Sequence, residues 1–166
     1  MTELLFSRTP NLHLTDEQAL RAQLRDYFIT TFDRYESLFE TLASDEAFYT
    51  KAISLRHPLI FYYGHTATFF VNKLLLTRLI SERLDARLES IFAVGVDEMS
   101  WDDLDGAHYE WPSVAEVKAY RDRVRALVVD LIDNAPLTLP VDWHNPWWAI
   151  IMGIEHERIH LETSSV

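Results

Sequence analysis

Two histidines, His156 and His160, lie four residues apart in the segment GIEHERIHLE near the end of the chain. At 3.6 residues per turn, side chains with this spacing lie one above the other on the same helix face, so both imidazoles could reach one metal ion. Alone, such a pair more often reflects packed or surface histidines than a metal site. The same face carries mostly small or apolar residues, which predicts that it faces a core: Ala149, Met152, Gly153 and Thr163.

A third histidine, His65, lies in a strongly apolar segment, LIFYYGHTATFF. A single histidine among aromatic residues is usually a hydrogen-bonded core residue. Three imidazoles directed into one core would each need a polar partner there, because a buried polar group without a hydrogen bond is costly. A shared divalent cation would satisfy all three. His65, His156 and His160 are therefore the predicted metal ligands.

Other polar residues near these histidines have weaker roles. Glu155 and Glu162 share a neighbouring face of the same helix, where they could orient an imidazole or form a salt bridge with another helix. His57 precedes Pro58 and is interpreted as a capping or surface residue. The remaining histidines lie in irregular stretches and are predicted to be capping or solvent-exposed: His13, His108 and His144.

Hydrophobic periodicity predicts four long amphipathic helices and one short helical piece. Capping boxes are expected at Thr15 with Gln18 and at Ser113 with Glu116. Residues 84–112 are the least regular part, either a solvated connection or a loop that lines the site. Long helices with one long connection between the second and third predict an all-α four-helix bundle. The predicted helices cover residues 16–43, 46–53 (the short piece), 58–82, 113–134 and 146–166.

Composition limits the alternatives. A length of 166 residues predicts one domain. An excess of 26 acidic over 15 basic residues, net charge −11, argues against nucleic acid or an anionic membrane as the main partner. Without cysteine, a metal site must use histidine or carboxylate ligands. Charged residues interrupt the longest apolar segment, which predicts a buried helix and not a membrane span. We expect a cytoplasmic protein, and a fragment, because the sequence stops within a predicted helix.

Three stretches carry a family resemblance: LRHPLIFYYGHTATFF, FAVGVDEMSWDDL and PWWAIIMGIEHERIHLETSSV. They resemble the N-terminal domain of the sulfoxide synthases of ovothiol biosynthesis (5-histidylcysteine sulfoxide synthases), which are siblings of the ergothioneine-pathway sulfoxide synthases. The resemblance implies a DinB-like four-helix bundle that supplies three histidines to a non-haem iron(II). The matching positions are His65, His156 and His160, and nickel or zinc could occupy the same ligands as substitutes.

The resemblance also implies a reaction. Family members couple cysteine to the imidazole of histidine with dioxygen, forming a carbon–sulfur bond and a sulfoxide. Three imidazoles leave open positions on iron for such chemistry. Where the ergothioneine branch has an arginine-bearing loop, this chain has Asp97, Glu98, Asp102 and Asp103. We interpret Asp97 and Glu98 as candidates to meet substrate amino groups.

The family enzymes continue into a formylglycine-generating-enzyme-like domain that supplies much of the substrate pocket. Nothing in this sequence corresponds to that domain, so we expect the chain alone to hold metal without turnover. Two alternatives stay open. One is a stand-alone DinB-like thiol transferase that uses zinc or nickel and a metal-bound thiolate. The other is a non-catalytic bundle whose metal only cross-links helices, which a fourth protein ligand would favour.

Overall fold

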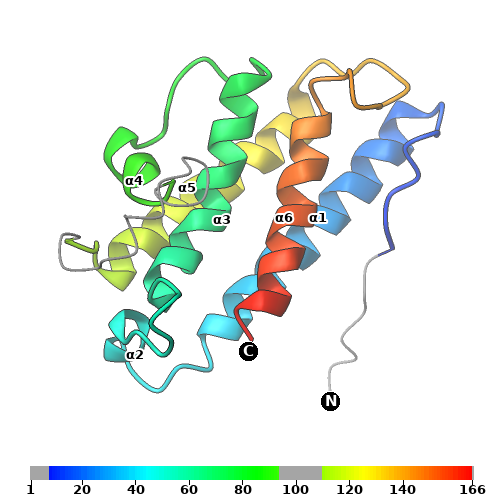
Figure 1. Ribbon diagram of the computed structural model, residues 1–166. Helices are drawn as coiled ribbons and strands as arrows, with labels where there is room; N and C mark the ends of the chain where they lie inside the picture. Colours follow the sequence, from blue (N-terminus) through cyan, green and yellow to red (C-terminus); the bar gives the residue numbers. More distant parts are fainter. Residues whose placement is uncertain (1–7, 94–109, 166) are drawn as a thin grey trace.

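The computed structural model describes residues 8–93 and 110–165, and over those residues it contains helices and no strand (Figure 1). This confirms the predicted all-α fold. The helices are α1 (Glu17–Phe39), α2 (Glu46–Tyr49), α3 (Leu59–Leu76), α4 (Ala86–Ile91), α5 (Val114–Asn134) and α6 (Trp148–Thr163). The connection between α3 and α5 includes α4, and residues 94–109 of it lie outside the described part of the chain.

The four long helices close into a bundle. In Figure 1, α3 and α6 lie side by side at the front, and α1 and α5 lie behind them. Helix α3 packs against α6 and α5, and α1 packs against the same two helices. Aromatic side chains from several elements fill the space between them because they bury the most apolar surface per residue. The largest buried aromatic residues are Tyr27, Phe28, Phe32, Tyr35, Phe61, Phe70, Phe92, Tyr120 and Trp147.

Helix α3 is the most apolar of the long helices, and it lies in the interior as predicted. Residues on nearly every side of it are buried, including the polar Thr66 and Thr68. A helix that is apolar all round is normally buried in this way. Within the described residues, no helix combines the length and apolarity that crossing a membrane requires.

The first residues of α1 and α5 test the N-cap residues that the sequence predicted. Asp16, not Thr15, caps α1: its carboxylate accepts the backbone N–H groups of Gln18 and Ala19 at 2.9 and 3.2 Å. At α5 half of the predicted capping box is present: the Ser113 hydroxyl accepts the Glu116 N–H at 3.2 Å, whereas the Glu116 carboxylate pairs with Arg87. Thr and Asp are both favourable N-cap residues, so when they are adjacent in the sequence the predicted first residue of a helix can be wrong by one position.

The ends of α1, α2, α3 and α6 all fall short of the predicted boundaries, and α6 ends at Thr163 with Ser164 as its C-cap. Helix α3 ends at Leu76 because Arg78 adopts a left-handed conformation with φ 60°. The N–H groups of Arg78 and Leu79 bond the carbonyls of Leu75 and Leu74, both at 3.0 Å. This is the Schellman pattern of helix termination, which usually has glycine at the left-handed position. An arginine there gives no signal in the sequence.

Candidate metal centre

Three histidines from two helices converge on one point. His65 comes from α3, and His156 and His160 come from α6; one nitrogen from each ring lies within 4.8 Å of the others. The ring centroids of His65 are 5.0 and 5.1 Å from those of His156 and His160, and the last two are 4.5 Å apart. His65 is fully buried and the other two are half-buried. The structure thus brings together the three residues that helical spacing singled out.

A backbone carbonyl orients His65. Its Nδ1 lies 2.8 Å from the carbonyl oxygen of Phe92, directly after α4. A carbonyl only accepts, so Nδ1 carries the hydrogen and Nε2 keeps its lone pair. That Nε2 lies 3.3 Å from Nε2 of His156. Metal-binding histidines usually donate their second N–H to such an oxygen, which fixes the tautomer and the ring.

A glycine permits this contact. A Cβ atom on Gly64 would lie 2.3 Å from the Phe92 ring, so only glycine allows Phe92 to approach α3 this closely. His65 directly follows Gly64 in the chain, so the contact between Gly64 and the Phe92 ring also brings the Phe92 carbonyl to the His65 ring. The described part of the 84–112 connection therefore packs against His65 and is more than a solvated linker.

His156 and His160 are held by different contacts. The His156 ring stacks on Phe69, with centroids 3.7 Å apart and an interplanar angle of 6°. Its Nδ1 is buried and has no hydrogen-bond partner in the described chain, so the stacking fixes the orientation of this ring. Nδ1 of His160 lies 3.4 Å from the hydroxyl of Thr163.

Both half-buried histidines are neutral at physiological pH. Burial, followed by the neighbouring histidines and Lys73, lowers the pKa of His156 to about 2. Burial, His65 and Arg56 lower the pKa of His160 to about 4. Metal binding requires the neutral imidazole, because a protonated ring has no free lone pair. These two rings need no deprotonation before they bind a cation.

The donor set fits a metal ion with open coordination positions. Across residues 8–93 and 110–165, the only ligand group of this kind contains the three imidazoles and no fourth histidine or carboxylate. Structural zinc is normally closed by four protein ligands, whereas catalytic sites keep a position for water or substrate. Nitrogen ligands suit iron, nickel, copper and zinc, so the ligands leave the identity of the metal open.

The other predicted residues lie elsewhere. Glu155 accepts a hydrogen bond of 2.5 Å from the Tyr27 hydroxyl of α1, and Glu162 is exposed. In the described residues neither carboxylate is hydrogen-bonded to a histidine. His13 and His144 are exposed, as predicted. The following positions lie outside the described residues: Asp97, Glu98, Asp102, Asp103 and His108.

The interpretation of His57 as a capping or surface residue was wrong. It is only 7% exposed, and its ring lies 4.2 Å from that of Phe61, one helical turn further along. Pro58 fixes an extended conformation before α3, and this directs the His57 ring inward onto the helix. The residue before a proline could not be assigned a face from periodicity.

Sequence reasoning missed three residues around the centre. The Phe92 contact uses a backbone oxygen, which no side-chain pattern reveals. Arg121 and Glu157 are both fully buried and form an ion pair at 2.9 Å behind the histidines. A signal for Arg121 existed, since it lies between the buried Tyr120 and Val124 on α5, but arginine is rarely buried unless it is paired.

Two comparisons with known proteins show what this chain is similar to. The family model described as the DinB superfamily matches residues 27–164, a range that includes the three histidines. Ergothioneine biosynthesis protein 1 of Neurospora crassa is 32% identical over 147 residues, which cover 81% of this chain and 16% of that protein. The chain therefore spans about a sixth of the length of this relative.

Proposed function

The chain belongs to the DinB superfamily, and from that premise we propose that it is the iron-binding domain of a non-haem iron sulfoxide synthase. His65, His156 and His160 are the proposed ligands. The observation that carries the proposal is the convergence of three imidazoles on one point with no fourth protein ligand among the described residues. The Neurospora relative, named for ergothioneine biosynthesis, supports this enzyme class.

The proposed reaction couples cysteine to the imidazole of histidine with dioxygen, as in ovothiol biosynthesis. The acidic stretch at Asp97 and Glu98, where the ergothioneine branch has arginine, favours free cysteine as the substrate. In balance, one dioxygen accepts four electrons: two from carbon–sulfur bond formation and two from oxidation of sulfur. One oxygen atom enters the sulfoxide and the other leaves as water.

In this proposal the histidines hold the iron, and neighbouring groups orient the histidine rings. When bound, iron(II) would supply the redox chemistry and the open positions for small ligands. The Phe92 carbonyl holds the Nδ1 hydrogen of His65 and leaves Nε2 available. Phe69 holds the ring of His156. Because this chain has no cysteine, it offers the metal no thiolate of its own, and the substrate is the proposed source of that thiolate.

Two other functions compete. A thiol transferase with zinc or nickel would use the same ligands and needs no dioxygen. A metal that only cross-links helices would be expected to gain a fourth protein ligand, and none accompanies the histidines in the described chain. The identity to a relative named for ergothioneine biosynthesis favours the sulfoxide synthase over both.

Metal analysis tests the site. We expect the chain purified anaerobically with iron(II) to hold about one metal ion, by analogy with three-histidine sites. His65→Ala, His156→Ala and His160→Ala should each lose stoichiometric metal. His13→Ala and His144→Ala, at exposed histidines outside the group of three, are the matched controls and should keep it. Near-normal metal content in any of the first three would remove that residue from the site.

The reaction needs a separate assay on the full-length product of the gene. We expect oxygen uptake that depends on iron and on both amino acids. Mass spectrometry should find a product equal to cysteine plus histidine, plus one oxygen atom and minus two hydrogen atoms. Thiol transfer that proceeds with zinc and consumes no oxygen would favour the transferase and contradict the sulfoxide synthase.

A further inference from the structure

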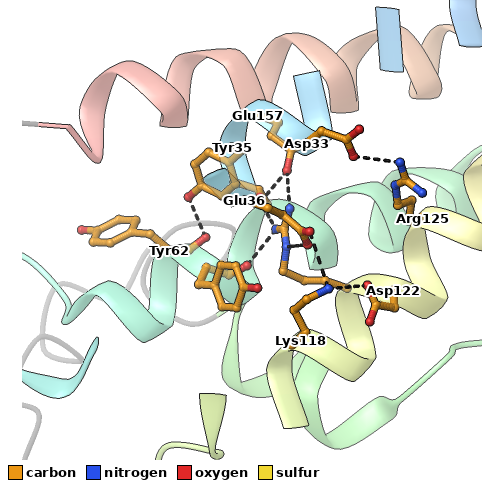
Figure 2. A network of polar contacts seen from close by, with 11 residues as sticks. Asp33, Tyr35, Glu36, Tyr62, Lys118, Asp122, Arg125 and Glu157 are labelled. Atoms are coloured by element: carbon orange, nitrogen blue, oxygen red, sulfur yellow. Dashed lines mark hydrogen bonds and ion pairs between the residues drawn. The ribbon is translucent and has the colours of Figure 1, made fainter. Parts of the chain in front are cut away.

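A buried arginine connects the helices behind the histidines. Arg121 of α5 has no exposed surface. Its guanidinium donates hydrogen bonds of 2.9 Å to the carbonyl of Tyr63 and the hydroxyl of Thr66, both on α3. It also donates to the carboxylates of Glu157 on α6 and Glu36 on α1, each at 2.9 Å. Figure 2 shows Glu36 and Glu157 gathered in this network.

Two residues of the network directly follow proposed metal ligands in the sequence. Thr66 follows His65 on α3, and Glu157 follows His156 on α6. The Thr66 hydroxyl donates to Glu157 at 3.2 Å, which gives a second polar link between the two helices. Consecutive residues on a helix point about 100° apart, so these links occupy a different face from the imidazoles. They set the spacing and rotation of α3 against α6.

Stability does not explain this arrangement well. Taking two ions out of water is expensive, and apolar replacement of a buried pair is often neutral or stabilising. One oxygen of Glu157, Oε2, is also buried without a hydrogen-bond partner among the described residues. A network chosen for stability alone would not leave a carboxylate oxygen unsatisfied. What the network supplies instead is a defined geometry between the two histidine-bearing helices.

We propose that Arg121 and Glu157 are positioning residues for the metal centre. Arg121 bonds both helices with the fixed fork of a single guanidinium, which lysine cannot reproduce. Through Thr66 and Glu157 it holds His65 and His156 at the separation that one ion requires. The inference rests on the proposed metal site and adds the residues that set its affinity and coordination geometry.

The double variant Arg121→Met with Glu157→Met tests the proposal. It removes both buried charges and leaves Glu36 beside Lys118, 3.7 Å away. We expect an unchanged or higher melting temperature for the metal-free chain, at least tenfold weaker cobalt(II) binding and an altered visible spectrum of the cobalt-loaded chain. Arg125→Met is the matched control, because the exposed Arg125–Asp33 pair joins α5 to α1 and does not bond α3 or α6. Its cobalt affinity and spectrum should match the unmodified chain.

Each other outcome has a definite meaning. A folded double variant with unchanged cobalt affinity and spectrum overturns the proposal. If the double variant does not fold, Arg121→Lys replaces it: weaker binding at a maintained melting temperature supports positioning, and unchanged binding overturns it. Parallel loss of melting temperature and affinity in both variants would assign a general structural role and overturn it. An unmodified chain that binds no cobalt and no iron overturns the proposed function, and this inference with it.

Discussion

A single glycine determines how His65 is held. Any side chain at Gly64 would collide with the Phe92 ring, and the Phe92 carbonyl holds the His65 ring. We expect Gly64→Ala to destabilise the chain by about 1–3 kcal/mol, as overpacked cores do. It should also weaken metal binding, because Phe92 must move away together with its carbonyl. Thermal unfolding and cobalt(II) titration measure the two effects.

A second variant separates the clash from other effects of alanine. Gly64→Ala with Phe92→Leu removes the colliding ring and keeps the backbone carbonyl. Metal affinity should then return toward that of the unmodified chain. The free energy of unfolding should recover less, because leucine in place of phenylalanine leaves a cavity in the core. If Gly64→Ala alone binds metal as tightly as the unmodified chain, the Phe92 contact does not control His65.

At this scale the sequence predicted side chains on helical faces and missed contacts that depend on tertiary structure. The 3.6-residue period is enough to place His156 and His160 on one face. Arg121 lies on a buried face of α5, but its pairing with Glu36 and Glu157 from two other helices could not be predicted. The same period placed Met152 on the inward face, yet it is 40% exposed. The histidine face of α6 therefore lies at the edge of the core.

At the scale of helices, packing of α6 against α3 depends on another glycine. A Cβ atom at Gly153 would lie 2.3 Å from the Phe70 ring, so the helices approach closely one turn before His156. Existence and type of the long helices were predictable, because each carries an apolar stripe over several turns. Their ends were not, since single capping residues and left-handed backbone conformations decide them.

The left-handed residue that ends α3 gives a prediction about an element boundary. Arg78 adopts φ 60°, a conformation that costs an ordinary residue roughly 1–2 kcal/mol and glycine little. After the greater entropy of glycine in the unfolded chain is subtracted, Arg78→Gly should stabilise the chain by up to about 1 kcal/mol. For a domain of this size that raises the melting temperature by about 2–4 °C.

The control for this substitution is Arg78→Ala, which removes the same side chain and keeps the Cβ atom. It should give no comparable gain, because alanine is strained in the same way as arginine. Metal affinity should be unchanged in both variants, since the Schellman turn lies at the far end of α3 from His65. Equal stabilisation by alanine and glycine would attribute the effect to the arginine side chain and not to the backbone.

At the scale of the whole molecule, the four long helices contribute different kinds of residue to the site. The proposed metal ligands come from α3 and α6, whereas α1 and α5 supply Glu36 and Arg121, which connect these two helices. The fold class was predictable because four apolar stripes can be buried together only by mutual packing. The arrangement of partners around the bundle was not, because every long helix offers a similar stripe.

This division predicts that metal binding and global stability are coupled. An ion that bridges α3 and α6 binds the folded chain and not the unfolded one, so it must raise the melting temperature. At a free metal concentration one hundred times the dissociation constant, the gain is about 2.7 kcal/mol. For a chain of this length that corresponds to a shift of about 5–10 °C. Scanning calorimetry with and without iron(II), under nitrogen, measures it, and a chelator should reverse it.

His156→Ala supplies the decisive comparison. It removes one proposed ligand from α6, so added metal should no longer raise its melting temperature. The metal-free melting temperature should change little because the ring is only half-buried. His144→Ala changes an exposed histidine in the loop before α6 and should keep the full metal-dependent shift. A metal-dependent shift of the same size in His156→Ala would mean that the stabilising ion binds elsewhere, and the convergence of the three imidazoles would then need another explanation.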